Sequence, residues 1–259
     1  MLNQRLKKIY LHRRALWDMT ARELKAKYAG SRLGLWWAVI TPLLLAVSIN
    51  FVFTKVFKLD TLNYTLFVLA GIIPWFFLAN SLMEATDSFI TRSALLRQAI
   101  FPREFIPLAS ILANFLSFLI GFFLLLPLFI ILNAKVIPFI IVLFPVIILQ
   151  LFFVLGLGLL FSCINVFFRD MSHFLSTAFM VWFWVTPIFY SLDTLPFPFR
   201  AVCLLNPMSY YVVLFQAFLF EAKFPNLSWI VAAFFISLVT FFVGYLVFIK
   251  QEAKLLKRI

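Results

Sequence analysis

The chain alternates between long apolar runs and short polar segments. Six runs of about 20 residues are long enough to cross roughly 30 Å of hydrocarbon as helices. Their apolar residues are continuous, unlike the strict alternation along a membrane β-strand, so the pattern predicts an all-α polytopic membrane protein. The six expected transmembrane helices cover 36–57, 64–83, 106–132, 137–162, 174–190 and 227–249.

One further apolar stretch, 199–220, is interrupted at Asn206 and Pro207. Each of its two pieces is too short to cross a membrane. A seventh crossing would also put the basic C-terminal tail on the opposite side from the other basic segments. We therefore expect two short re-entrant helices between spans 5 and 6.

The segment before the first span has a helical pattern of its own. Glu23 and Lys27 are spaced for an i,i+4 ion pair on its polar side. We expect an N-terminal amphipathic interface helix on the cytoplasmic surface, and the alternative is a solvated arm. The apolar face of this helix is formed by Trp17, Ala21, Leu24 and Tyr28. The expected organisation is one transmembrane domain over 1–259, with a cytoplasmic segment (1–35), a membrane region (36–249) and a cytoplasmic tail (250–259).

Composition and charge sharpen this picture. The 259 residues are 64% hydrophobic and 12% charged, with 36 Phe, which is more apolar side chain than a soluble domain can bury. Seventeen Lys and Arg lie on the segments expected in the cytoplasm and five on the opposite side. The positive-inside rule therefore predicts a multi-pass protein of a bacterial inner membrane with both termini in the cytoplasm. Anionic membrane lipids account for the net charge of +12, and we expect no nucleic acid partner.

Several kinds of chemistry are missing from the sequence. It has no G-x-x-x-x-G-K-S/T motif for nucleotide phosphates, and Gly156 and Gly158 indicate close helix packing instead. We expect no metal site, no catalytic residues and no cofactor in this chain. The central parts of the spans lack Asp, Glu, Lys and Arg, which argues against an ion-coupled carrier. Energy for any transport must therefore come from a partner.

Three motifs occur in order along the chain. An R-E-L-K-x-x-Y segment at 22–28 is followed by S-x-L-G-x-x-W at 31–37 and by Pro42. F-P-R-E stands at 101–104 and F-R-D at 168–170. Together they resemble ABC-2 type permeases that export polysaccharides, such as Wzm-type O-antigen exporters.

This resemblance implies a homodimer bound to two separate P-loop ATPase subunits, which would bind ATP and Mg. It also implies export of a lipid-linked polysaccharide, such as O-antigen on undecaprenyl diphosphate, to the outer face of the membrane. Exporters of capsule, teichoic acid or small hydrophobic compounds are alternatives within the same architecture. A non-transport membrane enzyme is a more distant one.

The resemblance and the local chemistry together select candidate residues. The segment that the resemblance marks as a coupling helix contacting the ATPase carries Phe89, Arg92, Leu96, Arg97, Ile100, Phe101, Pro102, Arg103 and Glu104. A second cytoplasmic contact or gate would use Arg169 and Asp170. The substrate entrance would use Lys27, Arg32 and Trp36, whose cations suit a diphosphate. Aromatic residues that could stack on sugars in a channel are Trp182, Trp184, Tyr190, Tyr210 and Tyr211.

Overall fold

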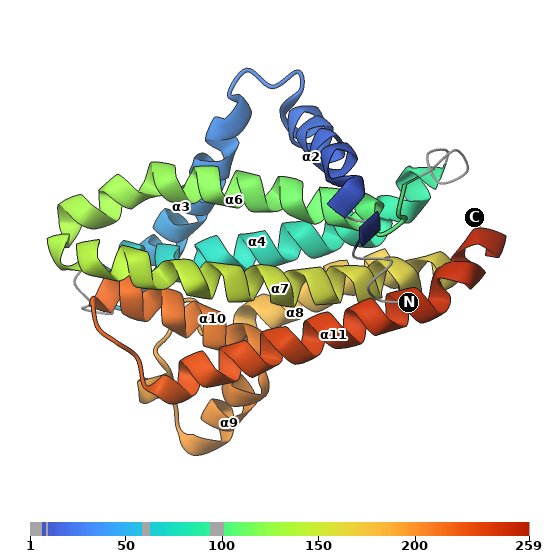
Figure 1. Ribbon diagram of the computed structural model, residues 1–259. Helices are drawn as coiled ribbons and strands as arrows, with labels where there is room; N and C mark the ends of the chain where they lie inside the picture. The colour runs from blue at the N-terminus through green and yellow to red at the C-terminus, as the bar shows by residue number, and fades with distance from the viewer. Residues whose placement is uncertain (1–6, 9, 59–62, 94–100, 259) are drawn as a thin grey trace.

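The computed structural model describes residues 7–8, 10–58, 63–93 and 101–258. Regular structure in these residues is entirely helical, which confirms the predicted all-α class. The long helices α4, α6, α7 and α11 pack into a bundle, and α2 with the start of α3 rises from one side of it (Figure 1). The α-helices are α2 (Arg13–Tyr28), α3 (Trp37–Phe51), α4 (Tyr64–Thr91), α6 (Phe105–Leu132), α7 (Ile137–Phe167), α8 (Met171–Val185), α9 (Phe197–Leu205), α10 (Pro207–Gln216) and α11 (Leu227–Arg258). Short 3-10 helices are η1 (Gly34–Trp36), η3 (Ala134–Val136) and η4 (Leu192–Thr194), and short π-helices are η2 (Val52–Val56) and η5 (Ala217–Glu221).

Five helical segments in the described residues are long and apolar enough to cross a membrane. They are Gly34–Val56, Tyr64–Thr91, Phe105–Leu132, Ala134–Phe167 and Leu227–Lys254, and they match five of the six predicted spans. Helix α4 lies at the centre, because α3, α6, α7, α8 and α10 all pack against it. A helix satisfies its own backbone hydrogen bonds, which hydrocarbon requires. The chain is therefore a multi-pass membrane protein.

Helices α7 and α11 approach each other through two glycines. A Cβ atom added to Gly244 would lie 2.0 Å from the carbonyl oxygen of Gly156, and one added to Gly156 would lie 2.3 Å from that of Thr240. A Cβ atom added to Gly158 would lie 2.5 Å from Cδ1 of Ile111 on α6. The prediction that small residues here permit close helix packing is confirmed.

Helix α8 ends earlier than the predicted fifth span. Pro187 restricts the residue before it to extended backbone, and Thr186 has φ −82° and ψ 135°. The helix therefore stops at Val185, and the last residues of the predicted span are not helical. Tyr190 satisfies the carbonyl freed at this end, since its hydroxyl donates to the oxygen of Val185 at 2.8 Å.

Asn206 lies where α9 and α10 meet at an angle of 100°. Its side-chain oxygen accepts from the backbone N–H of Met208 at 3.0 Å and from Trp182 Nε1 at 2.6 Å. Its amide nitrogen donates to the hydroxyl of Thr186 at 2.9 Å. One side chain thus caps α10 and ties it to the end of α8. The predicted break at Asn206–Pro207 is confirmed and a short helix lies on either side of it, while the re-entrant course of the pair stays a prediction.

Candidate functional site

A tight elbow joins α2 to α3, and the S-x-L-G-x-x-W motif builds it. The hydroxyl oxygen of Ser31 accepts hydrogen bonds from the backbone N–H of Gly34 and from Trp37 Nε1, both at 3.2 Å. Gly30 and Gly34 have φ values of +77° and +50°, which favour glycine over residues with a Cβ. The motif residues therefore set the direction in which the chain turns into the first span.

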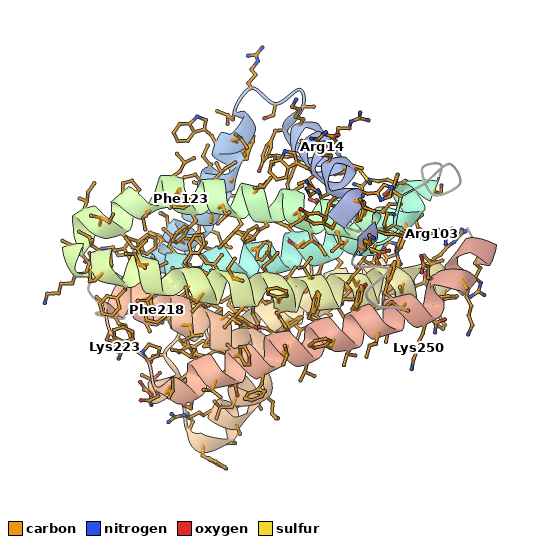
Figure 2. The ribbon with its side chains drawn as sticks, in the orientation of Figure 1. Arg14, Arg103, Phe123, Phe218, Lys223 and Lys250 are labelled. Atoms are coloured by element: carbon orange, nitrogen blue, oxygen red, sulfur yellow. The ribbon has the colours of Figure 1, made fainter. Side chains whose placement is uncertain are left out.

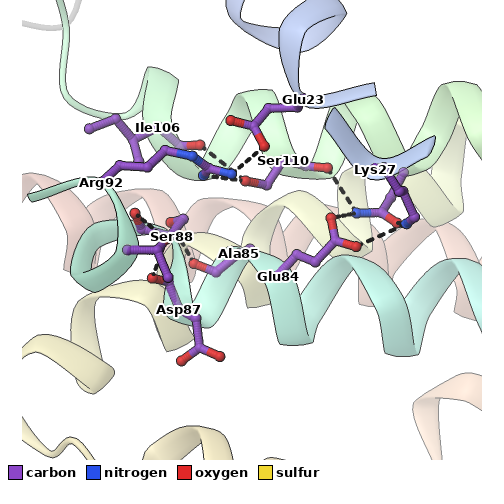
Figure 3. Close-up of polar contacts among 11 residues, drawn as sticks. Glu23, Lys27, Glu84, Ala85, Asp87, Ser88, Arg92, Ile106 and Ser110 are labelled. Carbon is purple, nitrogen blue, oxygen red and sulfur yellow. Dashed lines mark hydrogen bonds and ion pairs between the residues drawn. The ribbon is translucent and has the colours of Figure 1, made fainter. Parts of the chain in front are cut away.

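Two charged contacts hold α2 on the bundle, and Figure 3 shows both. In the first, Arg92 at the end of α4 forms an ion pair with Glu23 of α2. Arg92 also donates to the hydroxyl of Ser110 on α6 at 2.8 Å. The side chains of Arg92 and Glu23 are only 20% and 23% exposed, so this contact is partly shielded from water. It links α2, α4 and α6 at one point.

The second contact lies one helical turn further along α2. Lys27 Nζ lies 2.9 Å from Oε1 of Glu84 on α4 and also donates to the side-chain oxygen of Asn114 on α6. The amide of Asn114 donates to Oε2 of Glu84 at 2.6 Å. Asn114 is 3% exposed, whereas the side chains of Lys27 and Glu84 are 26% and 41% exposed. We call Lys27, Glu84 and Asn114 the polar clasp.

A cleft of about 310 Å³ opens beside the polar clasp, between the α2–α3 elbow and helices α4 and α6. Its non-aromatic polar side chains are those of Lys27, Thr41, Asn80, Asn114 and Ser117. Aromatic rings make much of the remaining wall, and these belong to Tyr28, Trp37, Phe76, Phe77, Phe118 and Phe122. A mostly apolar hollow with a few polar groups is the usual form of a site for an organic ligand.

A second hollow, an open groove of about 450 Å³, lies between α4 and α8. Asn80 lines both this groove and the cleft, so the two hollows adjoin at that residue. Ser176 and Trp184 add polar atoms on the α8 side, and the side chains of Met180 and Phe183 complete the wall. The adjoining hollows form one candidate path for a ligand along α4.

Of the three predicted entrance residues, one lines the cleft. Lys27 lines the cleft, while Arg32 is exposed on the elbow. Trp36 is 58% exposed and does not line the cleft, which is lined instead by its neighbour Trp37. The motif could have identified this residue, because its final W falls on Trp37. Sequence reasoning also missed Glu84, which comes directly after the predicted end of the second span.

The predicted i,i+4 pair of Glu23 and Lys27 is not formed. Glu23 pairs with Arg92 and Lys27 pairs with Glu84, so both charges reach to another helix instead of along their own. Thr20, on the same helix, is fully buried, while Trp17 of the predicted apolar face is 60% exposed. Helix α2 thus packs on α6 through a polar and mixed face.

Four of the five predicted channel aromatics use their polar atoms within the fold. Trp182 donates to Asn206, and the hydroxyl of Tyr190 donates to backbone carbonyls at the end of α8. Tyr210 donates to the carbonyl of Leu204 at 2.9 Å. Tyr211 is fully buried, and its hydroxyl lies 2.6 Å from that of Ser237 on α11. Trp184, 60% exposed, is the remaining member of the set and faces the open groove.

The predicted coupling segment is described only in part. Leu96, Arg97 and Ile100 lie outside the described residues. Phe89 is 1% exposed and packs against Phe248 of α11 with ring centroids 6.1 Å apart, so it offers no surface to a partner in this structure.

The F-P-R-E residues that follow are placed at the start of α6. Phe101 stacks on Phe105 at 6.1 Å, and Pro102 precedes the helix. Arg103 reaches Glu252 at the end of α11 at 3.8 Å. Glu104 is 2% exposed. Figure 2 shows Arg103 and Lys250 near the same end of the bundle and Lys223 near the other.

Arg169 and Asp170 are both exposed in the turn between α7 and α8. Asp170 occupies the N-cap position of α8, where the positive end of the helix dipole stabilises a carboxylate. Within the described residues, no three His, Cys, Asp or Glu side chains gather as metal ligands would.

Comparison with known proteins identifies the family. The family model described as ABC-2 type transporter matches residues 14–220. The chain is 31% identical over 235 residues to an O-antigen export system permease protein RfbA of Klebsiella pneumoniae, covering 90% of each chain. It is 32% identical over 240 residues to the protein of the same name from Myxococcus xanthus, covering 90% of this chain and 91% of that one. The match includes the elbow, the polar clasp and both hollows, and the chain belongs to the ABC-2 type transporter family.

Proposed function

We propose that the chain is the transmembrane permease subunit of an ATP-driven exporter. Its substrate would be a lipid-linked polysaccharide of the O-antigen type, carried on undecaprenyl diphosphate from the cytoplasmic to the outer face of the inner membrane. The observation that carries this proposal is the match along nine-tenths of both chains to relatives named as O-antigen export permeases. A match over nine-tenths of both chains favours a shared role over a shared fragment.

The proposal includes a separate ATPase, because the 259 residues contain no P-loop motif. Two such subunits, each with ATP and Mg, would bind a homodimer of this chain. The contact would lie on the segment that follows α4 and on the exposed turn at Arg169 and Asp170. Arg92 supports coupling at this place, since it ends α4 and holds α2 and α6 together.

The proposed topology has six crossings and both termini in the cytoplasm. Helix α8 has 15 residues, which cover about 22 Å at roughly 1.5 Å per residue, so α8 alone is too short to cross. The segment 186–190 that follows is bent rather than helical, with the N–H of Ile188 donating to the carbonyl of Thr186 at 2.7 Å, and it would continue this fifth crossing to Tyr190.

Buried partners satisfy this non-helical backbone, as hydrocarbon demands. Gln216 donates to the carbonyls of Pro187 and Ile188, both at 3.1 Å. The bent pair α9–α10 would then dip into the membrane from the outer side and return.

The cleft and the adjoining groove are the proposed start of the path. The polar clasp lies at the cytoplasmic end, where Lys27 would meet the diphosphate and Asn80 would lie between the two hollows. Trp184 would offer its exposed ring to the sugars. A second copy of the chain facing α3 and α8 would close the path, because α3 leaves Leu44, Val47 and Phe51 exposed on its outward face.

Co-purification of the ATPase tests the proposal. Leu96 is the sequence-predicted anchor of the contact segment, and Leu96→Asp would place an unpaired charge in a desolvated interface. Such burial costs several kcal/mol, and about 1.4 kcal/mol weakens association tenfold. We expect normal membrane levels of this variant, loss of the co-purified ATPase and glycan retained inside the cell. Lys135→Glu, at the opposite end of the molecule, is the control and should retain both. Full ATPase binding by the Leu96→Asp variant would contradict the proposed contact.

A further inference from the structure

A separate cleft of about 340 Å³ lies at the end of the molecule away from the polar clasp. It is enclosed by η4, α9, α10 with η5, and the beginning of α11. Four charged side chains of both signs line it, and neither the cleft beside Lys27 nor the α4–α8 groove has such a lining. Its volume falls in the range of about 300–1,000 Å³ that small-ligand sites occupy.

The charges in this cleft cancel. Asp193 and Glu221 are balanced by Arg200 and Lys223, and each acid has a basic neighbour. A free anion or a metal cation therefore meets little net charge there. A neutral ligand rich in hydroxyl groups is better matched, because each hydroxyl both donates and accepts and can use a carboxylate and a cation together.

The distances leave room for such a hydroxyl. Asp193 Oδ1 and Arg200 Nη2 are 3.8 Å apart, which is too long for a direct hydrogen bond and suits a bridging oxygen. Their side chains are 84% and 46% exposed, so a ligand reaches both without displacing packed structure. Asn226 contributes an amide to the same lining.

An aromatic wall completes the cleft. Trp229 lines it, and the ring of Tyr210 supports Trp229 with centroids 5.1 Å apart. Tyr210 is itself fixed by its hydrogen bond to the carbonyl of Leu204. Phe224 lies along the same wall. An indole held in place offers a rigid apolar surface for the C–H face of a sugar ring.

We propose that this cleft is a carbohydrate-binding site for one or two neutral sugar units of the exported glycan at the outer face. Asp193 and Arg200 would bind adjacent hydroxyl groups, and Trp229 would support the ring. The site rests on the proposed function, since it takes the substrate to be a polysaccharide leaving on the outer side. Such a site would hold the emerging chain and oppose its return.

Ligand-observed NMR titration tests the site with purified permease and its ATPase in nanodiscs. The probe is the oligosaccharide released by mild acid from the lipopolysaccharide of the strain that carries the chain. We expect binding to the wild type and roughly tenfold weaker binding to Asp193→Asn and to Trp229→Leu, because each loses one of the contacts described. Lys135→Gln, an outer-side charge outside the cleft, should bind as the wild type does. Asp193 is 84% exposed, so its variant tests the site without disturbing the fold.

Equal binding of the probe by all variants, or stronger binding of inorganic phosphate or Mg²⁺ than of the oligosaccharide, would overturn the site. So would the absence of probe binding by a wild-type complex that exports glycan in cells. The proposed function is judged separately, by whether deleting the chain removes polysaccharide from the cell surface. The two ideas therefore fail on different results.

Discussion

Replacing Asn114 by Leu removes the centre of the polar clasp while keeping a side chain of similar size. Asn114 donates to Glu84 at 2.6 Å and accepts from Lys27. Hydrogen bonds to charged groups contribute about 1.5–3 kcal/mol each when buried, and less where water competes. Because the side chains of Lys27 and Glu84 are 26% and 41% exposed, we take the low end and expect a loss of about 2–3 kcal/mol. The undocked population of α2 should then rise roughly 30- to 150-fold.

Alkylation of a cysteine placed at Thr20 measures that population. Thr20 is fully buried on α2, so a thiol there reacts with a maleimide only when the helix lifts away. The native thiols, Cys163 and Cys203, are also buried and serve as internal references. Asn80→Leu is the matched control, because it makes the same exchange at an exposed position lining the same cleft and should leave the rate unchanged. An increase below about threefold in the Asn114→Leu variant, under 1 kcal/mol, would refute the clasp as the element that holds α2.

Two further predictions follow from close contacts. Gly244→Ala brings a Cβ atom within 2.0 Å of a backbone oxygen of Gly156, and because that oxygen cannot move aside, the variant should be destabilised by about 3 kcal/mol. Its thermal unfolding midpoint in detergent should fall well below that of the control Val243→Ala, which lies at a half-exposed neighbouring position. Trp37→Phe removes the hydrogen bond to Ser31 and should speed limited proteolysis at the elbow roughly fivefold, about 1 kcal/mol, whereas Trp36→Phe should not. Equal melting in the first pair, or equal cleavage in the second, would contradict these contacts.

The apolar runs predicted most of the helices because the requirement behind them is local. Each long run must satisfy its backbone within itself, so length and hydropathy were enough for the five long spans. The end of α8 at Val185 is also predictable from the sequence, since Pro187 restricts the backbone of Thr186 whatever its surroundings. Pro207 restricts Asn206 in the same way, so the bend there is also predictable from the sequence.

The partners of polar side chains could not be predicted in this way. Spacing alone pairs Glu23 with Lys27, but Arg92 at the end of α4 and Glu84 within α4 lie close enough in space to take both charges. The sequence indicates that the indole N–H of Trp182 and the hydroxyl of Tyr190 could bind sugars. In the fold they instead donate to the side chain of Asn206 and to the carbonyl of Val185, where the helices end. Such contacts join residues far apart in sequence. Only the tertiary arrangement decides them.

The central claim is that this chain moves a lipid-linked polysaccharide across the inner membrane with energy from a separate ATPase. The most direct measurement compares the surface polysaccharide and the undecaprenyl-linked glycan of cells with and without the chain. We expect deletion to abolish the surface polysaccharide and to leave the lipid-linked glycan enclosed in the cytoplasm. Restoring the chain should reverse both changes only when the ATPase retains its P-loop lysine. Normal surface polysaccharide in the deletion strain, or full rescue with the inactive ATPase, would contradict the claim.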